Sequence, residues 1–341
     1  MDIKHLLKNN ARTIYLSAKI LPSEKQKTFS VAYLVCRIAD SVADTSLINA
    51  EKRIEFIKKF PVLVEQGDWQ TAQKMANSFL SKAGENIYKN EAELLKNIDL
   101  CIKEFETLKK ADKKITLEVL RAVSTAMIGD LTFFPSENSG LIKALPSEKE
   151  TLDYCDYMGG QPGVFWAKLE FGKKLKNKTQ EQALKIGRAL QITNILRDIE
   201  ADVKIGRIYL PLTQILKQDL MPQDLLETKN YLKLYPVMLY WIKEATQNLL
   251  NAKTFIKQIP RRKFFSRAAV AWPVFWSLDT LYILGRAPHK QGKKTKRKIT
   301  KTNIYLTMFF SPLYCFSNTF INKIIDYKES KIKSILGNSL R

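Results

Sequence analysis

The sequence predicts an all-α protein. Apolar residues recur three and four positions apart along most of the chain. Few stretches alternate strictly between apolar and polar residues or are rich in β-branched residues, as strands would be. Three segments, 23–26, 147–150 and 179–182, fit the capping box, in which a hydroxyl and a Glu or Gln side chain satisfy the free amides at a helix start. Helices are therefore expected to begin near Ser23, Ser147 and Thr179.

The chain of 341 residues is long enough for one large core or two modest domains. The loop 135–146, which contains the run SENSG between two prolines, is the clearest internal break. The motifs described below lie on both sides of this loop and must converge to act together. One all-α domain is therefore the favoured organisation.

Composition restricts the class of function. Only His5 and His289 are present, which argues against a Ser-His hydrolase or a zinc site. The cysteines at 36, 101, 155 and 315 have no metal-ligand spacing, so we expect buried thiols in a reducing compartment. The N-terminal segment has no apolar core typical of a secretory signal. The net charge of +22 suits nucleic acid, an anionic membrane surface or an anionic small substrate as partner.

The C-terminal part carries two unusual segments. Between Arg286 and Lys301 the chain is rich in Lys and Arg and contains no acid, as in a solvated linker or a segment that contacts lipid head groups. The segment 304–320 is uncharged and aromatic, but it is shorter than a spanning helix needs and contains Pro312. We expect it to pack on the core or to lie at a membrane surface.

Two helices end in a pair of aspartates. Phe29, Tyr33, Cys36, Asp40 and Asp44 share one helical face, which begins apolar and ends in two carboxylates one turn apart. On a second helix the same spacing relates the residues Gly187, Gln191, Asn194, Asp198 and Asp202.

An arginine stands close to each pair, Arg37 before Asp40 and Arg197 before Asp198. A lone pair of aspartates is usually a solvated helix face, and like charges at this spacing cost a helix a few tenths of a kcal/mol. Two pairs among Ile, Val and Ala indicate instead that negative charge is gathered for a hard cation. Mg²⁺ prefers oxygen ligands and is usually held by one or two carboxylates together with phosphates and water. Pairs that face each other could hold several Mg²⁺ ions around a diphosphate, with the two guanidiniums on its oxygens.

These segments resemble the squalene and phytoene synthase family. The segment 37–44, RIADSVAD, resembles the first aspartate-rich motif of the family, and 194–202, NILRDIEAD, followed by 206–211, GRIYLP, resembles the second. The segment 154–163, YCDYMGGQPG, is similar to the family's Tyr-Cys segment, and 13–22, TIYLSAKILP, to its N-terminal substrate segment. The resemblance runs from about residue 10 to about residue 285.

The resemblance implies an isoprenoid synthase fold, a single large helical bundle around a central apolar cavity. It implies Mg²⁺-dependent head-to-head condensation of two prenyl diphosphates through a cyclopropyl diphosphate, with Mn²⁺ as an alternative metal. The metal and diphosphate face would comprise Asp40, Asp44, Asn194, Asp198 and Asp202. Catalytic roles would fall to Tyr154, Arg37 and Arg197. These three residues would also contact the substrate, together with Arg12, Thr13, Tyr33, Gln191, Arg207 and Tyr209.

A carbocation intermediate requires a dry site with aromatic faces. Candidates for the cavity wall are Phe29, Tyr33, Phe133, Phe134, Phe165 and Trp166. Gln161 and Pro162 depart from the family's small apolar stretch, and Gly159 stands where alanine is common, so the identity of the product stays open. Ala201 stands where glutamate is common, but Asp198 and Asp202 remain, so metal binding is expected to survive. The glycines at 159, 160 and 163 lie in a helical pattern and are not a dinucleotide fingerprint.

Two substrates remain open. Farnesyl diphosphate would give presqualene diphosphate and then squalene or dehydrosqualene, with NADPH required if the product is squalene. Geranylgeranyl diphosphate would give phytoene. The segments 261–265 and 271–281 favour the C30 reaction slightly. Two alternatives of other classes are a non-catalytic relative that acts as an assembly factor and a basic helical protein that binds nucleic acid or membrane; retention of all four aspartates favours the enzyme.

The expected organisation is a synthase domain over 1–285, a basic linker over 286–302 and an amphipathic, aromatic tail over 303–341. No nucleic-acid partner is expected. The basic and aromatic C-terminal segment predicts a cytoplasmic protein that contacts the inner face of the cytoplasmic membrane peripherally.

Overall fold

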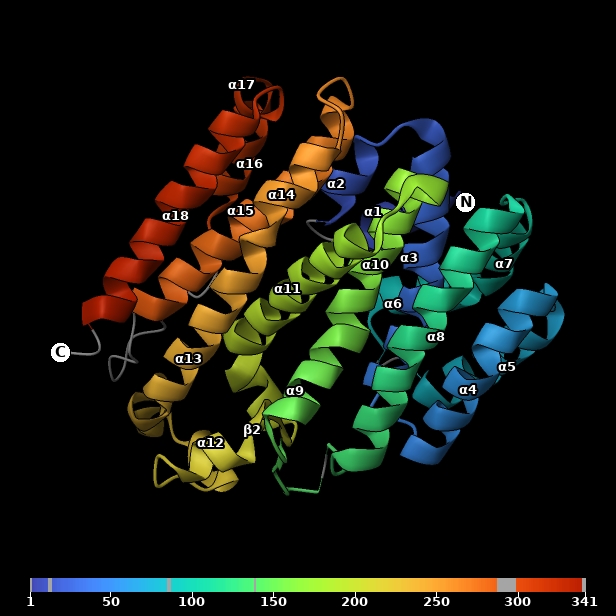
Figure 1. Cartoon of the computed structure of the whole chain (residues 1–341). Helices are drawn as coiled ribbons and strands as arrows, with labels where there is room; N and C mark the ends of the chain where they lie inside the picture. The colour runs from blue at the N-terminus through green and yellow to red at the C-terminus, as the bar shows by residue number, and fades with distance from the viewer. Residues whose placement is uncertain (1, 12–13, 85–86, 138, 287–298, 339–341) are drawn as a thin grey trace. The chain divides into compact units, whose positions relative to one another are not determined.

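The structure, a computed structural model, describes residues 2–11, 14–84, 87–137, 139–286 and 299–338. Helices account for almost all of its regular structure (Figure 1), which confirms the predicted all-α class. The chain forms two compact units, the first comprising Met1–Asn138 with Lys168–Lys173 and the second Ser139–Ala167 with Lys174–Arg341. The first division falls inside the predicted loop 135–146. The predicted domain limits at 285 and 302 stay predictions.

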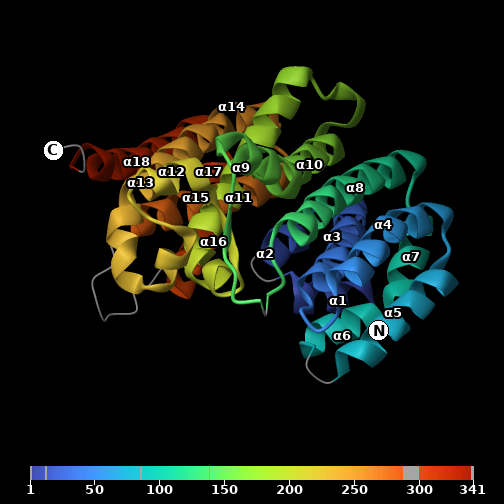
Figure 2. The same ribbon diagram turned by 90° about the horizontal axis from the view of Figure 1, so that it is seen from below.

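The first unit is built around α3 (Ser23–Asp44), whose buried face is lined by Val, Leu, Ile and Ala side chains. This helix packs against α8, α7, α1 and α4 (Figure 2). The other helices of the unit are α1 (Ile3–Asn10), α2 (Ile14–Lys19), α4 (Ala50–Gln66), α5 (Trp69–Ala83), α6 (Lys89–Lys96), α7 (Ile98–Glu106) and α8 (Lys110–Phe133). The aspartate pair therefore stands at the C-terminal end of the helix that forms the centre of this unit.

The second unit is built around α11 (Asn177–Lys204), which contacts α13, η2, α14 and α15 (Figure 1). A short parallel sheet pairs β1 (Lys143–Leu145) with β2 (Arg207–Pro211), in the register Lys143 to Arg207. The remaining elements are α9 (Glu148–Cys155), η2 (Asp156–Gly160), α10 (Gln161–Phe171), η3 (Gly172–Lys174), α12 (Leu212–Leu216), η4 (Pro222–Leu226), η5 (Thr228–Asn230), α13 (Tyr231–Leu249), α14 (Asn251–Gln258), α15 (Phe264–Arg286), α16 (Lys301–Phe309), α17 (Ser311–Cys315) and α18 (Asn318–Asn338).

One of the three predicted helix caps is confirmed. Ser147 caps α9, and its hydroxyl accepts a hydrogen bond from the backbone amide of Lys149 and donates one to Glu150. The cap predicted at Ser23 is wrong, because Pro22 takes the cap position and no side chain caps α3. Proline fixes an extended entry into the helix, and Ser23 is already helical.

The cap predicted at Thr179 is also wrong, because α11 begins at Asn177 with Lys176 as its cap. The hydroxyl of Thr179 donates to the side chain of Gln258, and Gln182 donates to Thr254 at 2.8 Å. Both side chains of the supposed capping box therefore join α11 to α14. Hydrogen bonds to α14 replace the local capping bonds, which is the usual reason that a cap motif inside a helix fails.

The glycines of the segment 154–163 lie where η2 and α10 cross α11. A Cβ on Gly187 would come within 2.1 Å of the carbonyl oxygen of Gly159, and a Cβ on Gly163 within 2.3 Å of the carbonyl oxygen of Ala183. No side chain separates the two backbones at this crossing. The glycines serve close helix packing, in agreement with the prediction that they are not a dinucleotide motif.

We predict that Gly187→Ala lowers the free energy of unfolding by about 1–3 kcal/mol, because the new methyl group must push two backbones apart. Gly129→Ala on α8 is the matched control, since a Cβ there meets nothing within 4 Å. The control should raise the free energy of unfolding by about 0.5–1 kcal/mol. Urea denaturation of both variants measures the difference, and equal effects would contradict the proposed crossing.

Candidate functional site

The first aspartate pair lies on one face of α3, as predicted. Tyr33, Arg37 and Asp40 are half-buried and Asp44 is exposed, whereas the residues between them are mostly buried. The side chain of Arg37 is 21% exposed and that of Asp40 is 26% exposed. The carboxylates thus stand at the edge of the core, where they are accessible but only partly solvated.

Arg37 is held by two carboxylates. Its guanidinium donates to Asp40, three residues later on the same helix, and to Oε1 of Glu91 on α6 at 2.8 Å. Burial disfavours the charged guanidinium, but the carboxylates of Asp40 and Glu91 outweigh it, so the pKa of Arg37 lies above its ordinary value. Sequence reasoning missed Glu91, because nothing in its local sequence shows that α6 packs beside α3.

The apolar half of the α3 face is also ordered. The Tyr33 hydroxyl donates to the carbonyl of Asn10 at 3.0 Å, and its ring stacks on Phe29 with centroids 6.4 Å apart. Tyr33 is therefore tied to the end of α1, close in sequence to the predicted phosphate contacts. Those contacts, Arg12 and Thr13, lie outside the described residues.

The second aspartate pair lies on α11 in the second unit. Gln191, Asn194, Asp198 and Asp202 are half-buried on a helix whose intervening residues are largely buried. Nε of Arg197 donates to Oδ1 of Asp198 at 2.9 Å, and a second guanidinium nitrogen donates to Oδ2. Two parallel bonds of this kind orient the carboxylate as well as compensate its charge.

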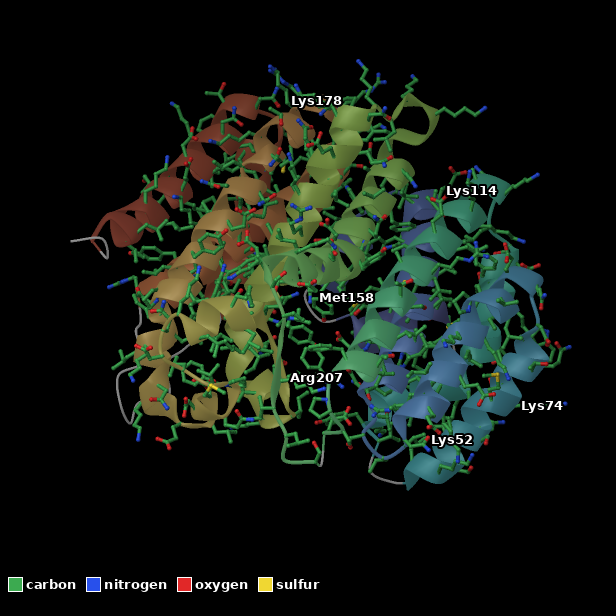
Figure 3. The ribbon with its side chains drawn as sticks, turned by 60° about the horizontal axis from the view of Figure 1, so that its bottom comes forward. Lys52, Lys74, Lys114, Met158, Lys178 and Arg207 are labelled. Atoms are coloured by element: carbon green, nitrogen blue, oxygen red, sulfur yellow. The ribbon has the colours of Figure 1, made fainter. Side chains whose placement is uncertain are left out.

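Two predicted tyrosines of the second unit lie together. The rings of Tyr154 on α9 and Tyr209 on β2 are stacked, with centroids 4.4 Å apart. The hydroxyl of Thr151 donates to the carbonyl of Tyr209 at 2.8 Å, which fixes β2 against α9. Arg207, labelled in Figure 3, precedes Tyr209 on the same strand and is 7% exposed. The structure therefore brings Tyr154 together with Tyr209, which lies on another element, two residues after Arg207.

Tyr154 is followed by a π-helical turn, η2, which includes Met158 (Figure 3). Pro162 cannot donate to a carbonyl of the preceding turn, and widening that turn relieves the clash of its ring. Arg188 on α11 donates to both carboxylate oxygens of Asp156 at 2.6 Å. This ion pair fixes the turn to the helix of the second aspartate pair, and sequence reasoning did not find it.

The donor atoms fit a hard divalent cation. Each pair supplies two carboxylates one helical turn apart, and Asn194 adds an amide oxygen on α11. Over the described part of the chain, no cluster of three or more His, Cys, Asp and Glu side chains surrounds a common point. A Mg²⁺ ion on an aspartate pair would complete its ligands with phosphate and water, which is its usual coordination in proteins.

The predicted residues divide between the units. Tyr33, Arg37, Asp40 and Asp44 belong to the first unit, and the predicted residues from Tyr154 to Tyr209 belong to the second. In each unit an aspartate pair, an arginine and at least one tyrosine are placed by the same central helix and its neighbours. Both units thus present an aspartate pair, compensated by an arginine of the same helix, on a helical scaffold.

The family is shown by comparison with known proteins. Residues 7–302 match the family model of squalene/phytoene synthase, so the chain belongs to this family. It is 24% identical over 289 residues to the bifunctional lycopene cyclase/phytoene synthase of Colletotrichum graminicola, covering 84% of this chain and 46% of the relative. It is 24% identical over 209 residues to human squalene synthase, and the match covers 60% of this chain and 45% of the human protein. The chain thus spans about half the length of these curated relatives.

The fold agrees with that of solved squalene synthases. The complex of TcSQS with the ligand E5700 superposes with a TM-score of 0.75 at 18% identity, covering 98% of this chain and 97% of the other. A dehydrosqualene synthase superposes with a TM-score of 0.63 at 20% identity, and the superposition covers 92% of this chain and 94% of the other. The predicted isoprenoid synthase fold is therefore confirmed.

We predict that none of the four cysteines reacts quickly with a thiol reagent in the native protein. Burial, with a smaller contribution from the charge of Asp40, raises the pKa of Cys36 to about 12, and burial raises the pKa of each of the other three. A thiol whose pKa is raised carries almost no reactive thiolate at about pH 8. Release of thionitrobenzoate should be slow until denaturant exposes all four thiols. A fast native reaction assigned to Cys36 by mass spectrometry would contradict this environment.

Proposed function

We propose that this protein joins two prenyl diphosphates head to head with release of diphosphate. The observation that carries the proposal is the repeated arrangement of an aspartate pair with a charge-compensating arginine on the central helix of each unit. Membership of the squalene/phytoene synthase family supports the same reaction. In each pair the leading aspartate, Asp40 or Asp198, is half-buried and bonded to an arginine, which a solvated helix face does not require.

Binding begins with the diphosphate groups. Asp40 with Asp44, and Asp198 with Asp202, would hold Mg²⁺, which acts as a Lewis acid for a departing diphosphate. Arg37 and Arg197 form ion pairs with Asp40 and Asp198. With metal ions on the carboxylates, these guanidiniums would be placed to donate two parallel hydrogen bonds to phosphate oxygens.

The residues around the substrate must then shield a carbocation from water. Loss of diphosphate leaves an allylic carbocation, and the double bond of the second prenyl diphosphate attacks it to form a carbon–carbon bond and a new carbocation. Loss of a proton from this cation to the released diphosphate closes the ring and gives the cyclopropyl diphosphate. The stacked rings of Tyr154 and Tyr209 offer π-faces that stabilise positive charge and exclude water. Their pairing also fixes the position of both hydroxyl groups along α9 and β2.

Farnesyl diphosphate is the favoured substrate, with presqualene diphosphate and then squalene or dehydrosqualene as products. Likeness to squalene synthases supports it. Geranylgeranyl diphosphate, converted to phytoene, is the second candidate, because phytoene synthases also appear among the relatives. NADPH would be consumed only if the product is squalene, since that step adds hydride.

The proposal is tested by incubating the purified chain with Mg²⁺ and either farnesyl or geranylgeranyl diphosphate, each with and without NADPH. Mass analysis of the extracted products should give one Mg²⁺-dependent C30 or C40 product. The mass also shows whether hydride was added. If folded protein consumes neither substrate, the alternative of a non-catalytic assembly factor is favoured.

We predict that Asp40→Asn and Asp198→Asn each lower kcat/KM by about 10²–10³-fold or more, because each removes a charged metal ligand while keeping its shape. Glu55→Gln is the matched control, since Glu55 is an exposed carboxylate on α4 that pairs with Lys59. Steady-state rates at saturating Mg²⁺ measure the effect. Wild-type rates in either aspartate variant would rule out the assignment of metal ligands.

A further inference from the structure

The second unit carries a concentrated exposed apolar surface on α16, α17 and the start of α18. Phe309 is 74% exposed, Leu313 66% and Tyr305 62%, fractions that are unusual for large apolar side chains. We call this the aromatic surface; its exposed members are Phe265, Tyr305, Leu306, Phe309, Phe310, Leu313, Phe316 and Phe320. Isolated exposed apolar residues need no explanation, but a group of this size does.

The members of the aromatic surface are adjacent in space as well as in sequence. Tyr305 and Phe309 are four residues apart on α16 and therefore share a face. The rings of Phe264 and Phe316 lie 5.1 Å apart, and those of Phe264 and Phe265 lie 5.2 Å apart. The start of α15 thus continues the surface formed by α17.

Hydrogen bonds of buried side chains fix the helices that carry the aromatic surface. The hydroxyl of Tyr314 donates to the carbonyl of Thr307 at 2.6 Å, and Nε1 of Trp272 donates to the hydroxyl of Ser311 at 2.7 Å. Tyr314 and Ser311 are buried while their neighbours Leu313 and Phe316 are exposed. The apolar side chains are therefore presented outward by a packed helical turn.

A buried arginine completes this support. Arg267 on α15 is fully buried and donates to the carbonyls of Ile256 and Ile259 at 2.9 and 2.8 Å, to the carbonyl of Cys315 at 2.6 Å, and to Asn318. It therefore joins α14, α15, α17 and α18. A buried guanidinium that satisfies carbonyls of three separate segments fixes their relative positions.

The charge around the aromatic surface has one sign. Residues 301–325 contain no Asp or Glu. Exposed cations flank the surface, with Arg261, Arg262 and Lys263 before α15, Lys301 at the start of α16 and Lys323 on α18. Apolar side chains surrounded by cations complement an anionic lipid surface, which offers negative head groups above an apolar layer.

We propose that the aromatic surface is a docking site for an anionic lipid bilayer, in which α16 and α17 lie at the interface and do not span it. α18 packs on α15, and α17 joins α16 to α18 beside these helices (Figure 1). Within the described residues, α15 alone is long and apolar enough to cross a membrane, but 72% of its apolar window is buried inside the unit, as in a core helix. The sequence predicted contact through the whole tail; the structure narrows it to this surface.

Co-sedimentation of the full chain with vesicles tests the proposal. The chain should bind vesicles of phosphatidylcholine mixed with phosphatidylglycerol, and salt should weaken this binding. The double variant Phe309→Ser with Phe316→Ser should bind about tenfold more weakly or worse, because two aromatic side chains no longer enter the lipid. Arg261→Gln with Arg262→Gln should lose about fivefold for each charge removed.

Matched controls lie in the first unit. Tyr88→Ser removes an aromatic side chain that is 80% exposed, and Lys52→Gln with Lys58→Gln removes two exposed cations. Both should bind as the wild type does. In Phe309→Trp, brominated lipids should quench the added fluorescence, and in Tyr88→Trp they should not.

Three outcomes would overturn the proposal. The first is a wild-type chain that does not bind anionic vesicles at low salt. The second is equal binding by the Phe309→Ser, Phe316→Ser variant, with circular dichroism showing that it is folded. The third is sedimentation of the wild type as a dimer that this variant dissociates, which would assign the surface to a second copy of the chain. None of these outcomes depends on condensation activity.

Discussion

Charge compensation of aspartates on half-buried helical faces is the constraint on which the site depends. Two carboxylates one turn apart repel each other, and the repulsion grows as water is removed. In both units an arginine of the same helix engages the leading aspartate, and Glu91 adds a second carboxylate to Arg37. The arginine therefore offsets the repulsion within each pair, and the carboxylate oxygens would serve as ligands for a metal ion. The same arginines would then lie close to the phosphate groups that accompany the metal.

The second unit adds a constraint on shape. Because glycines allow η2 and α10 to touch the backbone of α11, the turn that follows Tyr154 approaches the helix with Asp198 more closely than side chains would permit. The ion pair between Arg188 and Asp156 secures the same contact, and the hydrogen bond from Thr151 to the carbonyl of Tyr209 fixes β2 against α9. The position of the stacked tyrosines thus depends on residues that have no role in the chemistry.

The sequence predicted the helical class, the shared faces of α3 and α11 and the arginine beside each aspartate, because all of these follow from helical periodicity. It could not predict Glu91 or Asp156, since their partners lie on other helices and local spacing says nothing about which helices pack together. The predicted cap at Thr179 failed for the same reason, because Gln258 of α14 takes its hydroxyl. The pairing of β1 with β2 could not be predicted either, because strands this short show no recognisable alternation of apolar and polar residues. The uncharged aromatic segment was visible in the sequence, but which of its residues are exposed depends on Arg267 and Tyr314 beneath it.

The most direct test of the account is calorimetric titration of the full chain with inorganic diphosphate, with and without Mg²⁺. If the aspartate pairs bind diphosphate through metal ions, binding should require Mg²⁺ and should be lost or strongly weakened in Asp198→Asn. Binding of equal strength without Mg²⁺, or unchanged binding in Asp198→Asn, would show that the arginines alone bind the anion and would contradict the metal-centred account.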